Sequence, residues 1–119
     1  DLGCGDGKTI FYAAKNFQAK AIGVEFSLPL YLFCRLKNLF YGWALFKFKN
    51  LYDEDLSKAD VVYFFGMPGK VNLKFKKKLL SEMKPGAKII SYAFGFPDWR
   101  PEIVDKPGEN DLPIFLYKI

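Results

Sequence analysis

The chain has 119 residues, of which 50% are hydrophobic, and this composition suits one folded domain and excludes intrinsic disorder. Two cysteines are too few for a disulfide scaffold, and with no histidine the sequence has no imidazole base or histidine metal ligand. We therefore expect a cytoplasmic protein without a metal site, and neither zinc-dependent nor histidine-based hydrolysis.

In its first half the chain alternates glycine-rich, helical and strand-like segments. In order we expect a loop, a helix, a strand, a helix and a strand over residues 3–7, 8–17, 20–26, 28–41 and 43–48. Ser27 is a plausible N-cap of the second helix, and Gly42 is a good stop for it. Apolar residues surround most of this second helix, so we expect it to be buried against more than a sheet.

The second half begins with a polar loop over residues 50–59. A buried strand (60–65), a turn of Gly66, Met67, Pro68 and Gly69, a helix (71–83) and a strand (87–94) follow. Segments 102–105 and 114–118 are expected to form a terminal hairpin. Lysines between 70 and 78 are read as a solvated helix face, and as the alternative a docking patch for an acidic partner.

Strands that alternate with helices predict a three-layer α/β fold over residues 1–119, with a mostly parallel sheet and a terminal antiparallel hairpin. We expect a single domain. Asp1, Leu2 and Gly3 have the character of the end of a buried strand that runs into a loop. We therefore expect the rest of that strand upstream of Asp1.

The motif with chemical content is Asp1-Leu2-Gly3-Cys4-Gly5-Asp6-Gly7. Alternate glycines let the backbone turn sharply and approach a ligand, and the next helix presents its N-terminus there. Glu25 closes the next predicted strand, where the carboxyl ends of parallel strands line the ligand crevice. A carboxylate at that place can accept hydrogen bonds from both hydroxyls of a ribose.

Two cofactor classes use this arrangement. A dinucleotide fingerprint needs G-x-G-x-x-G, whereas here the third glycine comes one position early. The pattern D-x-G-x-G-x-G resembles the first motif of class I S-adenosylmethionine-dependent methyltransferases, which have a Rossmann-like fold. A nicotinamide dehydrogenase and a non-catalytic nucleotide-binding domain are the alternatives.

Later phrases resemble a narrower group. The stretches DLSKADVVYFFGMP, MKPGAKIIS and FGFPDW, within residues 55–99, are similar to small protein-lysine methyltransferases related to those that act on the ATP synthase c-subunit and the adenine nucleotide translocase. This resemblance implies a protein lysine as the acceptor, and leaves a membrane-protein substrate open. It assigns no catalytic base. From this resemblance we expect an N-terminal helix and most of the first strand upstream of Asp1.

Motif and resemblance together give two sets of candidate residues. Cofactor contacts are expected from Asp1, Gly3, Cys4, Gly5, Asp6, Gly7, Glu25, Phe26, Asn50, Leu51 and Phe65. A substrate channel is expected from Gly66, Met67, Pro68, Phe94, Phe96 and Trp99. Each aromatic residue has core packing as its alternative role.

Other acceptors stay open at this point. Methyltransferases of nucleobases and glutamine carry [DN]-P-P-[YF] after the fourth strand, whereas this chain has Phe65-Gly66-Met67-Pro68, which argues against base methylation. Only Arg35 and Arg100 among the 18 basic residues are arginine, so the net charge of +5 points only weakly to nucleic acid. A small molecule or RNA is the alternative acceptor to protein.

Overall fold

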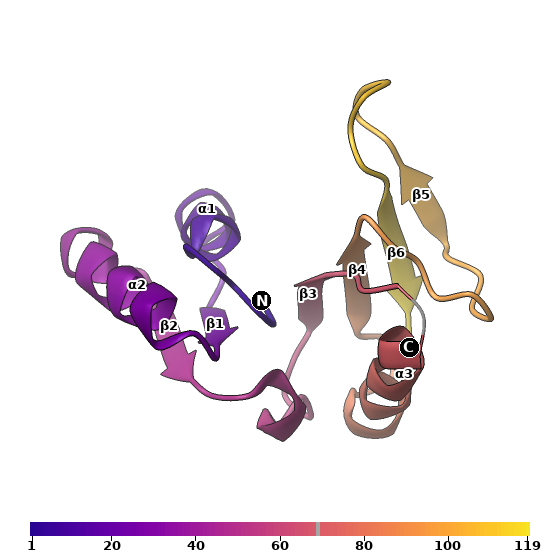
Figure 1. The fold of residues 1–119 in the computed structure, drawn as a ribbon, viewed down its shortest axis with the longest axis horizontal. Coiled ribbons are helices and arrows are strands. Elements are labelled where there is room, and N and C mark those ends of the chain that lie inside the picture. The colour runs from indigo at the N-terminus through magenta and orange to yellow at the C-terminus, as the bar shows by residue number, and fades with distance from the viewer. Residues whose placement is uncertain (69) are drawn as a thin grey trace. The chain divides into compact units, whose positions relative to one another are not determined.

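Figure 1 shows the computed structural model, which describes residues 1–68 and 70–119. Gly69, expected to close the turn after the buried strand, lies outside the described residues. The chain divides into two compact units, residues 1–54 and 55–119. The expected helices and strands are confirmed, each within a few residues of its expected bounds.

The first unit contains helix α1 (Lys8–Phe17), strand β1 (Ala21–Glu25), helix α2 (Leu28–Tyr41), strand β2 (Ala44–Phe48) and the short 3-10 helix η1 (Leu51–Asp53). The second contains strand β3 (Val61–Phe65), helix α3 (Lys70–Glu82) and strands β4 (Lys88–Tyr92), β5 (Ile103–Asp105) and β6 (Ile114–Lys118).

In the first unit, β1 and β2 pair in parallel, and Leu2 forms a bridge to Val24 that is also parallel. The register sets Glu25 opposite Phe48 at the carboxyl ends of both strands. Helix α1 buries Ile10 and Phe11 against this sheet, as its apolar spacing predicts. The core of the unit therefore lies directly behind the glycine-rich loop.

Helix α2 differs from its expectation. Gly42 ends it in the left-handed conformation, as expected, but Ser27 makes no side-chain cap hydrogen bond. Cys34 is its only fully buried residue, while apolar side chains such as Leu39 and Phe40 are exposed. The expected burial on several sides is not found, because within this chain the helix packs only its inner face.

The second unit holds a four-stranded sheet of order β3-β4-β6-β5. Strands β3 and β4 are parallel, and β6 is antiparallel to both β4 and β5. The core is aromatic: the Phe64 ring packs edge-on against Phe75 of α3, with 4.7 Å between centroids. The parallel pair and the closing antiparallel hairpin confirm the expected strand directions.

Two kinds of feature are absent from the described part of the chain. No helix there is long and apolar enough to cross a bilayer. No group of three or more cysteine, aspartate or glutamate side chains there is placed to hold a metal ion.

Candidate functional site

The glycine-rich loop follows the Leu2 bridge and enters α1. Gly3, Gly5 and Gly7 all have positive φ, at 82°, 54° and 75°. A Cβ at Gly3 or Gly5 would meet no atom within 4 Å, whereas one at Gly7 would lie 3.0 Å from the Phe11 ring and 3.1 Å from Cys34 Sγ. The first two glycines therefore leave the loop surface open to a ligand, and the third allows the loop to pack on the core.

Glu25 holds this loop in place. Its Oε2 accepts a hydrogen bond of 2.8 Å from the Gly5 N–H, and its Oε1 accepts the N–H groups of Phe26 and Ser27 at 2.9 and 2.7 Å. The structure thus brings the predicted acid and the predicted loop into direct contact. These three hydrogen bonds use three of the roughly four acceptor positions of a carboxylate. One position on Oε2 is therefore free to accept a hydrogen bond from a ligand.

The remaining loop residues are bound through the backbone or locally. The Asp1 carbonyl accepts the Val24 N–H at 2.9 Å, and the Cys4 N–H donates to the Val24 carbonyl at 3.0 Å. Asp6 Oδ1 accepts the Lys8 N–H at 3.1 Å, so this carboxylate, one residue before the N-cap Gly7, binds the first backbone amide of α1.

Aromatic and polar groups follow the two strands of the first unit. Phe26 is exposed and stacks on Phe48, with ring centroids 6.1 Å apart and planes 6° apart. Asn50 Oδ1 accepts the Tyr52 N–H at 3.0 Å and so caps η1, in which Leu51 is half-buried. Phe48 was not among the predicted residues, and it lies beside Phe26 because β1 and β2 pair in register.

Both cysteines lie behind the loop and are free thiols. Burial, then the nearby Cys34 thiol and Glu25 carboxylate, raise the pKa of Cys4 to about 12. Burial also raises the pKa of Cys34, whose Sγ donates to the Gly5 carbonyl at 3.1 Å. Neither thiol is activated for chemistry, and both pack the loop against the core.

In the second unit the candidate channel residues fall on two loops that touch. Gly66 follows β3, and its N–H donates to the Tyr92 carbonyl at 2.7 Å. A Cβ at Gly66 would collide with the Phe94 carbonyl oxygen. Ser91 Oγ donates to that same carbonyl at 2.6 Å, which fixes the turn after β4. The close approach of Gly66 to Phe94 brings the segments after β3 and β4 together. Met67 is half-buried and Pro68 exposed.

The aromatic candidates divide by exposure. Phe65 and Phe94 are exposed by 51% and 42%, so both rings are available to a substrate. Phe96 is only 4% exposed and packs between Phe64, Trp99 and Tyr117, so its side chain belongs to the core of this unit. Trp99 is half-buried on the same cluster.

Tyr117 anchors the loop after β4, and no sequence pattern marked it. This residue is 1% exposed, and its phenolic oxygen accepts the Phe96 N–H at 2.9 Å. We expect Tyr117→Phe to lower the free energy of unfolding by about 1–3 kcal/mol, because a buried N–H loses its acceptor. Urea denaturation measures this, with the exposed Tyr12→Phe as the matched control; equal losses in both variants would contradict it.

The same substitution has a signature at high pH. Burial raises the pKa of Tyr117, and the hydrogen bond from Phe96 offsets this only in part. The unfolded phenol therefore ionises first as pH rises past about 10, and the native protein loses stability there. Tyr117→Phe has no phenol to ionise at this position and so lacks this loss of stability at high pH. The difference in free energy of unfolding between the variant and the native chain therefore becomes smaller above about pH 10.

A Gly-rich loop that enters a helix and is bonded to the acid at the end of the next parallel strand defines a Rossmann-like cofactor-binding domain. Residues 1–103 match the ANTKMT methyltransferase domain. The chain belongs to this family and is a class I S-adenosylmethionine-dependent methyltransferase.

Two similar proteins refine the comparison. The chain is 38% identical to a "Protein-lysine N-methyltransferase" of Saccharolobus islandicus, over 100% of this chain and 77% of the relative. It is 32% identical to the human lysine N-methyltransferase of the ATP synthase C-subunit, over 91% of the chain and 47% of that relative. The chain thus spans about half the length of the human protein.

A solved structure is similar over the whole chain. It is an RNA methyltransferase from Salinibacter ruber in complex with S-adenosyl-L-homocysteine, with a TM-score of 0.92 and 29% identity over 100% of this chain and 78% of that one. A bound methyltransferase product in this neighbour agrees with a family that uses S-adenosylmethionine.

The residues of the loop fit such a cofactor. The surface at Gly3 and Gly5 is open, so a ligand can approach the backbone closely. Glu25 retains acceptor capacity for a ribose hydroxyl, and acceptance of both hydroxyls requires exchange of the Gly5 contact. The loop and the acid are therefore suited in shape and chemistry to a cofactor with a ribose.

Proposed function

We propose that this protein transfers a methyl group from S-adenosylmethionine to the side-chain amine of a protein lysine, in the cytoplasm. The observation that carries the cofactor assignment is the open surface of the glycine loop beside Glu25, whose Oε2 lies 2.8 Å from the Gly5 nitrogen. The lysine acceptor is supported by relatives whose names specify lysine, one of them similar over the full chain. The low cysteine count, two in 119 residues, supports a reducing location.

On this proposal the cofactor lies along the open surface of the glycine loop. The ligand approaches the loop backbone closely at Gly3 and Gly5. Glu25 accepts one ribose hydroxyl at its free position and the second in exchange for the Gly5 contact. Phe26 offers an exposed aromatic surface supported by Phe48. Asp1, Cys4, Asp6, Gly7, Asn50, Leu51 and Phe65 remain predicted contacts of the cofactor-binding set.

When bound, S-adenosylmethionine supplies a methyl group activated by the positive charge of its sulfonium. The chain's own residues then need to bind the lysine, align its amine and favour its neutral form. Alignment is worth roughly 7–11 kcal/mol in favourable cases. A free lysine has a pKa of about 10.4, and an apolar environment lowers it.

Exposed aromatic rings on the second unit are suited to this task. Phe65 ends β3 and Phe94 lies in the loop after β4, with Met67 and Pro68 shortly after Phe65 in sequence. Such surfaces desolvate an ammonium group and attract the methylammonium that forms. Phe96 contributes by packing behind its loop, and Trp99 is a further candidate. A strong general base is not required, which is compatible with a chain that lacks histidine.

RNA is the second candidate acceptor, because the Salinibacter ruber neighbour is described as an RNA methyltransferase. The net charge of +5 is compatible with an anionic substrate. Against it stands the Phe65-Gly66-Met67-Pro68 sequence, which lacks the pattern of base methyltransferases. We favour protein.

The test is methyl transfer with tritiated S-adenosylmethionine and two acceptor pools, total protein and total RNA from the same cells. We expect label in protein only, and recovery of methyllysine after acid hydrolysis. Glu25→Gln is the matched inactive control. Label in RNA that resists protease would favour the second candidate, and label in neither pool by a chain that binds the cofactor would overturn both.

A further inference from the structure

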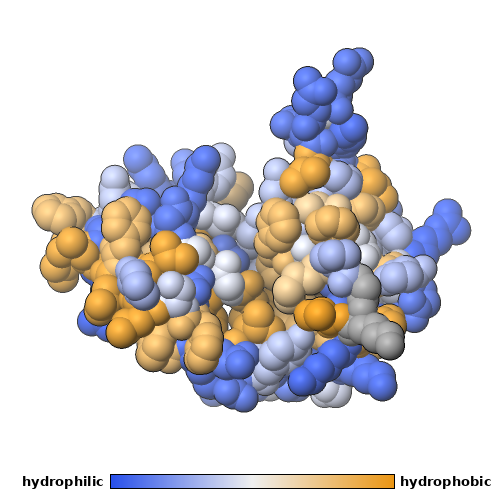
Figure 2. All heavy atoms as spheres, viewed as in Figure 1, coloured by the Kyte–Doolittle hydropathy of each residue, from blue (hydrophilic) through white to orange (hydrophobic). Residues whose placement is uncertain are grey.

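The outer face of α2 is apolar and exposed, and the methyl-transfer site makes no use of it. Leu39 is 79% exposed and Phe40 83%, values that are unusual for such large side chains in a folded protein. Figure 2 shows hydrophobic side chains gathered over this helix, which Figure 1 labels α2. The inner face, with Cys34, packs on the core of the first unit.

These side chains form one continuous stripe along the helix. We call it the α2 stripe, and it comprises Leu32, Phe33, Leu36, Leu39 and Phe40. Their spacings of three and four residues place them on one face. A stripe of this width on the outside of a helix is typical of an apolar docking surface.

Basic side chains border the stripe on both sides. Arg35 is three residues from Leu32 and four from Leu39, so it lies at one edge. Lys37 lies at the other edge, with its Nζ 5.7 Å from the Phe33 ring centroid and 4.9 Å from that of Phe11. The whole stretch of residues 26–52 contains no acidic residue.

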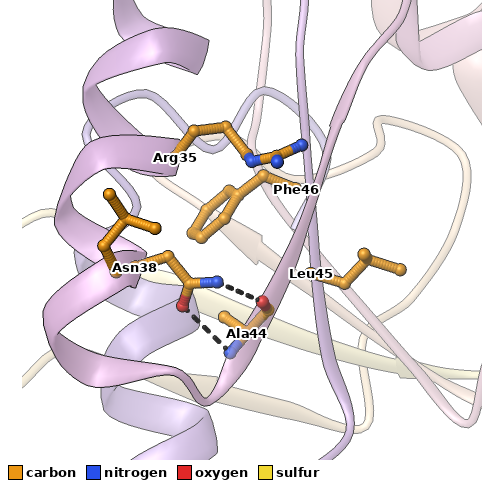
Figure 3. A pocket seen from close by; sticks show the side chains of 6 residues that line it. Arg35, Asn38, Ala44, Leu45 and Phe46 are labelled. Carbon is orange, nitrogen blue, oxygen red and sulfur yellow. Dashed lines mark hydrogen bonds between the residues drawn. The ribbon is translucent and has the colours of Figure 1, made fainter.

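Two further features lie beside this helix. Trp43 is half exposed just after the helix, and Lys15 of α1 lies 5.9 Å from its ring. A hollow of about 230 Å³ opens between α2 and β2 beside Arg35 and Leu39. Figure 3 shows this hollow, in which the Asn38 side chain is hydrogen-bonded to both backbone groups of Ala44. Arg35 is the charged residue of its lining.

We propose that the α2 stripe and its basic borders dock the protein on the surface of an anionic lipid bilayer. An apolar face with arginine or lysine at its edges and tryptophan nearby matches a helix that lies in the plane of a membrane interface. Charge decides against a second copy of this chain, because a symmetric pair would set Arg35 and Lys37 of both copies together. No carboxylate within 26–52 could neutralise them.

The bound orientation follows from the side chains. The leucines and phenylalanines of the stripe enter the acyl boundary, while Arg35 and Lys37 extend to the headgroups. The hollow beside Arg35 is placed to receive a headgroup phosphate, because this guanidinium donates one hydrogen bond to the Tyr31 hydroxyl and has further N–H groups. The proposal is independent of the acceptor of the methyl group.

The test is co-sedimentation of the full chain with vesicles of phosphatidylcholine alone and of equimolar phosphatidylcholine and phosphatidylserine. We expect binding to the anionic vesicles, weakened by salt. The double variant Leu39→Ser/Phe40→Ser should bind the anionic vesicles more weakly, by about tenfold for each side chain replaced. Arg35→Gln should lower the affinity for these vesicles about fivefold. The control Leu80→Ser/Val104→Ser changes two exposed apolar residues of the second unit and should bind as the native chain does.

Two results would overturn the proposal. One is the absence of binding to anionic vesicles, and the other is binding that Leu39→Ser/Phe40→Ser leaves unchanged. Sedimentation velocity without lipid tests whether a second copy of the chain covers the stripe instead. The stripe would be assigned to a second copy if the native chain self-associates, the double variant does not, and neither binds vesicles. Retained binding of S-adenosylmethionine by the double variant shows that it is folded.

Discussion

Replacement of Glu25 by glutamine is expected to weaken the binding of S-adenosylmethionine about 100-fold or more. A charged acceptor for a hydroxyl is worth roughly 1.5–3 kcal/mol, and the proposed ribose contact has two such bonds. The variant also harms the loop itself, because the new amide group would face the Gly5 N–H that Glu25 Oε2 now accepts. Calorimetric titration measures both the native and the variant affinity.

The matched control is Glu109→Gln, the same change at an exposed acid of the second unit. It should leave the affinity unchanged, and circular dichroism should show both variants folded. Parallel titration with NADH tests the dinucleotide alternative, for which we expect no binding. Equal affinity of Glu25→Gln and native protein for S-adenosylmethionine would remove Glu25 from the cofactor site.

Gly7→Ala is expected to lower the free energy of unfolding by about 2–5 kcal/mol. Left-handed backbone costs a residue with a Cβ about 1–2 kcal/mol, and overpacking a core adds about 1–3 kcal/mol. Both costs apply here, because Gly7 has φ 75° and its Cβ would press on the Phe11 ring, Cys34 Sγ and the Phe46 ring at 3.0–3.1 Å. Urea denaturation provides the measurement.

Gly42→Ala separates the two contributions. Gly42 also has positive φ, at 66°, but its Cβ would meet no atom within 4 Å. It should therefore show only the backbone cost, and the difference between the two variants is the packing cost at the loop. If both variants lost the same stability, the close contact behind Gly7 would not be a real constraint on the loop.

The contact between the glycine-rich loop and the acid was predictable from the sequence. Local chemistry determines it: alternate glycines give a tight loop, and an acid at the end of the next strand must face that loop in a parallel sheet. The contact between Gly5 and Glu25 bears this out. Phe48 was missed because it joins the site through strand pairing with Glu25, which the alternation of residues along one strand does not reveal.

The aromatic residues were less predictable, since phenylalanine has the same pattern in a core and in a channel. Phe94 and Phe96 are two positions apart in one loop, yet the first is exposed and the second is buried. The difference arises from Tyr117, whose hydroxyl holds the Phe96 N–H and whose ring packs on Phe96. That partner lies 21 residues further along the chain.

Helix α2 shows the same limit at the level of surfaces. Its apolar residues predicted burial on several sides, because composition cannot distinguish a core helix from one with an apolar outer face. By itself, the sequence determined the order of helices and strands, the glycine loop and its acid, since these follow from local periodicity and backbone freedom. The tertiary structure alone decided which apolar side chains form the core and which remain exposed, because burial depends on partners that are distant in sequence.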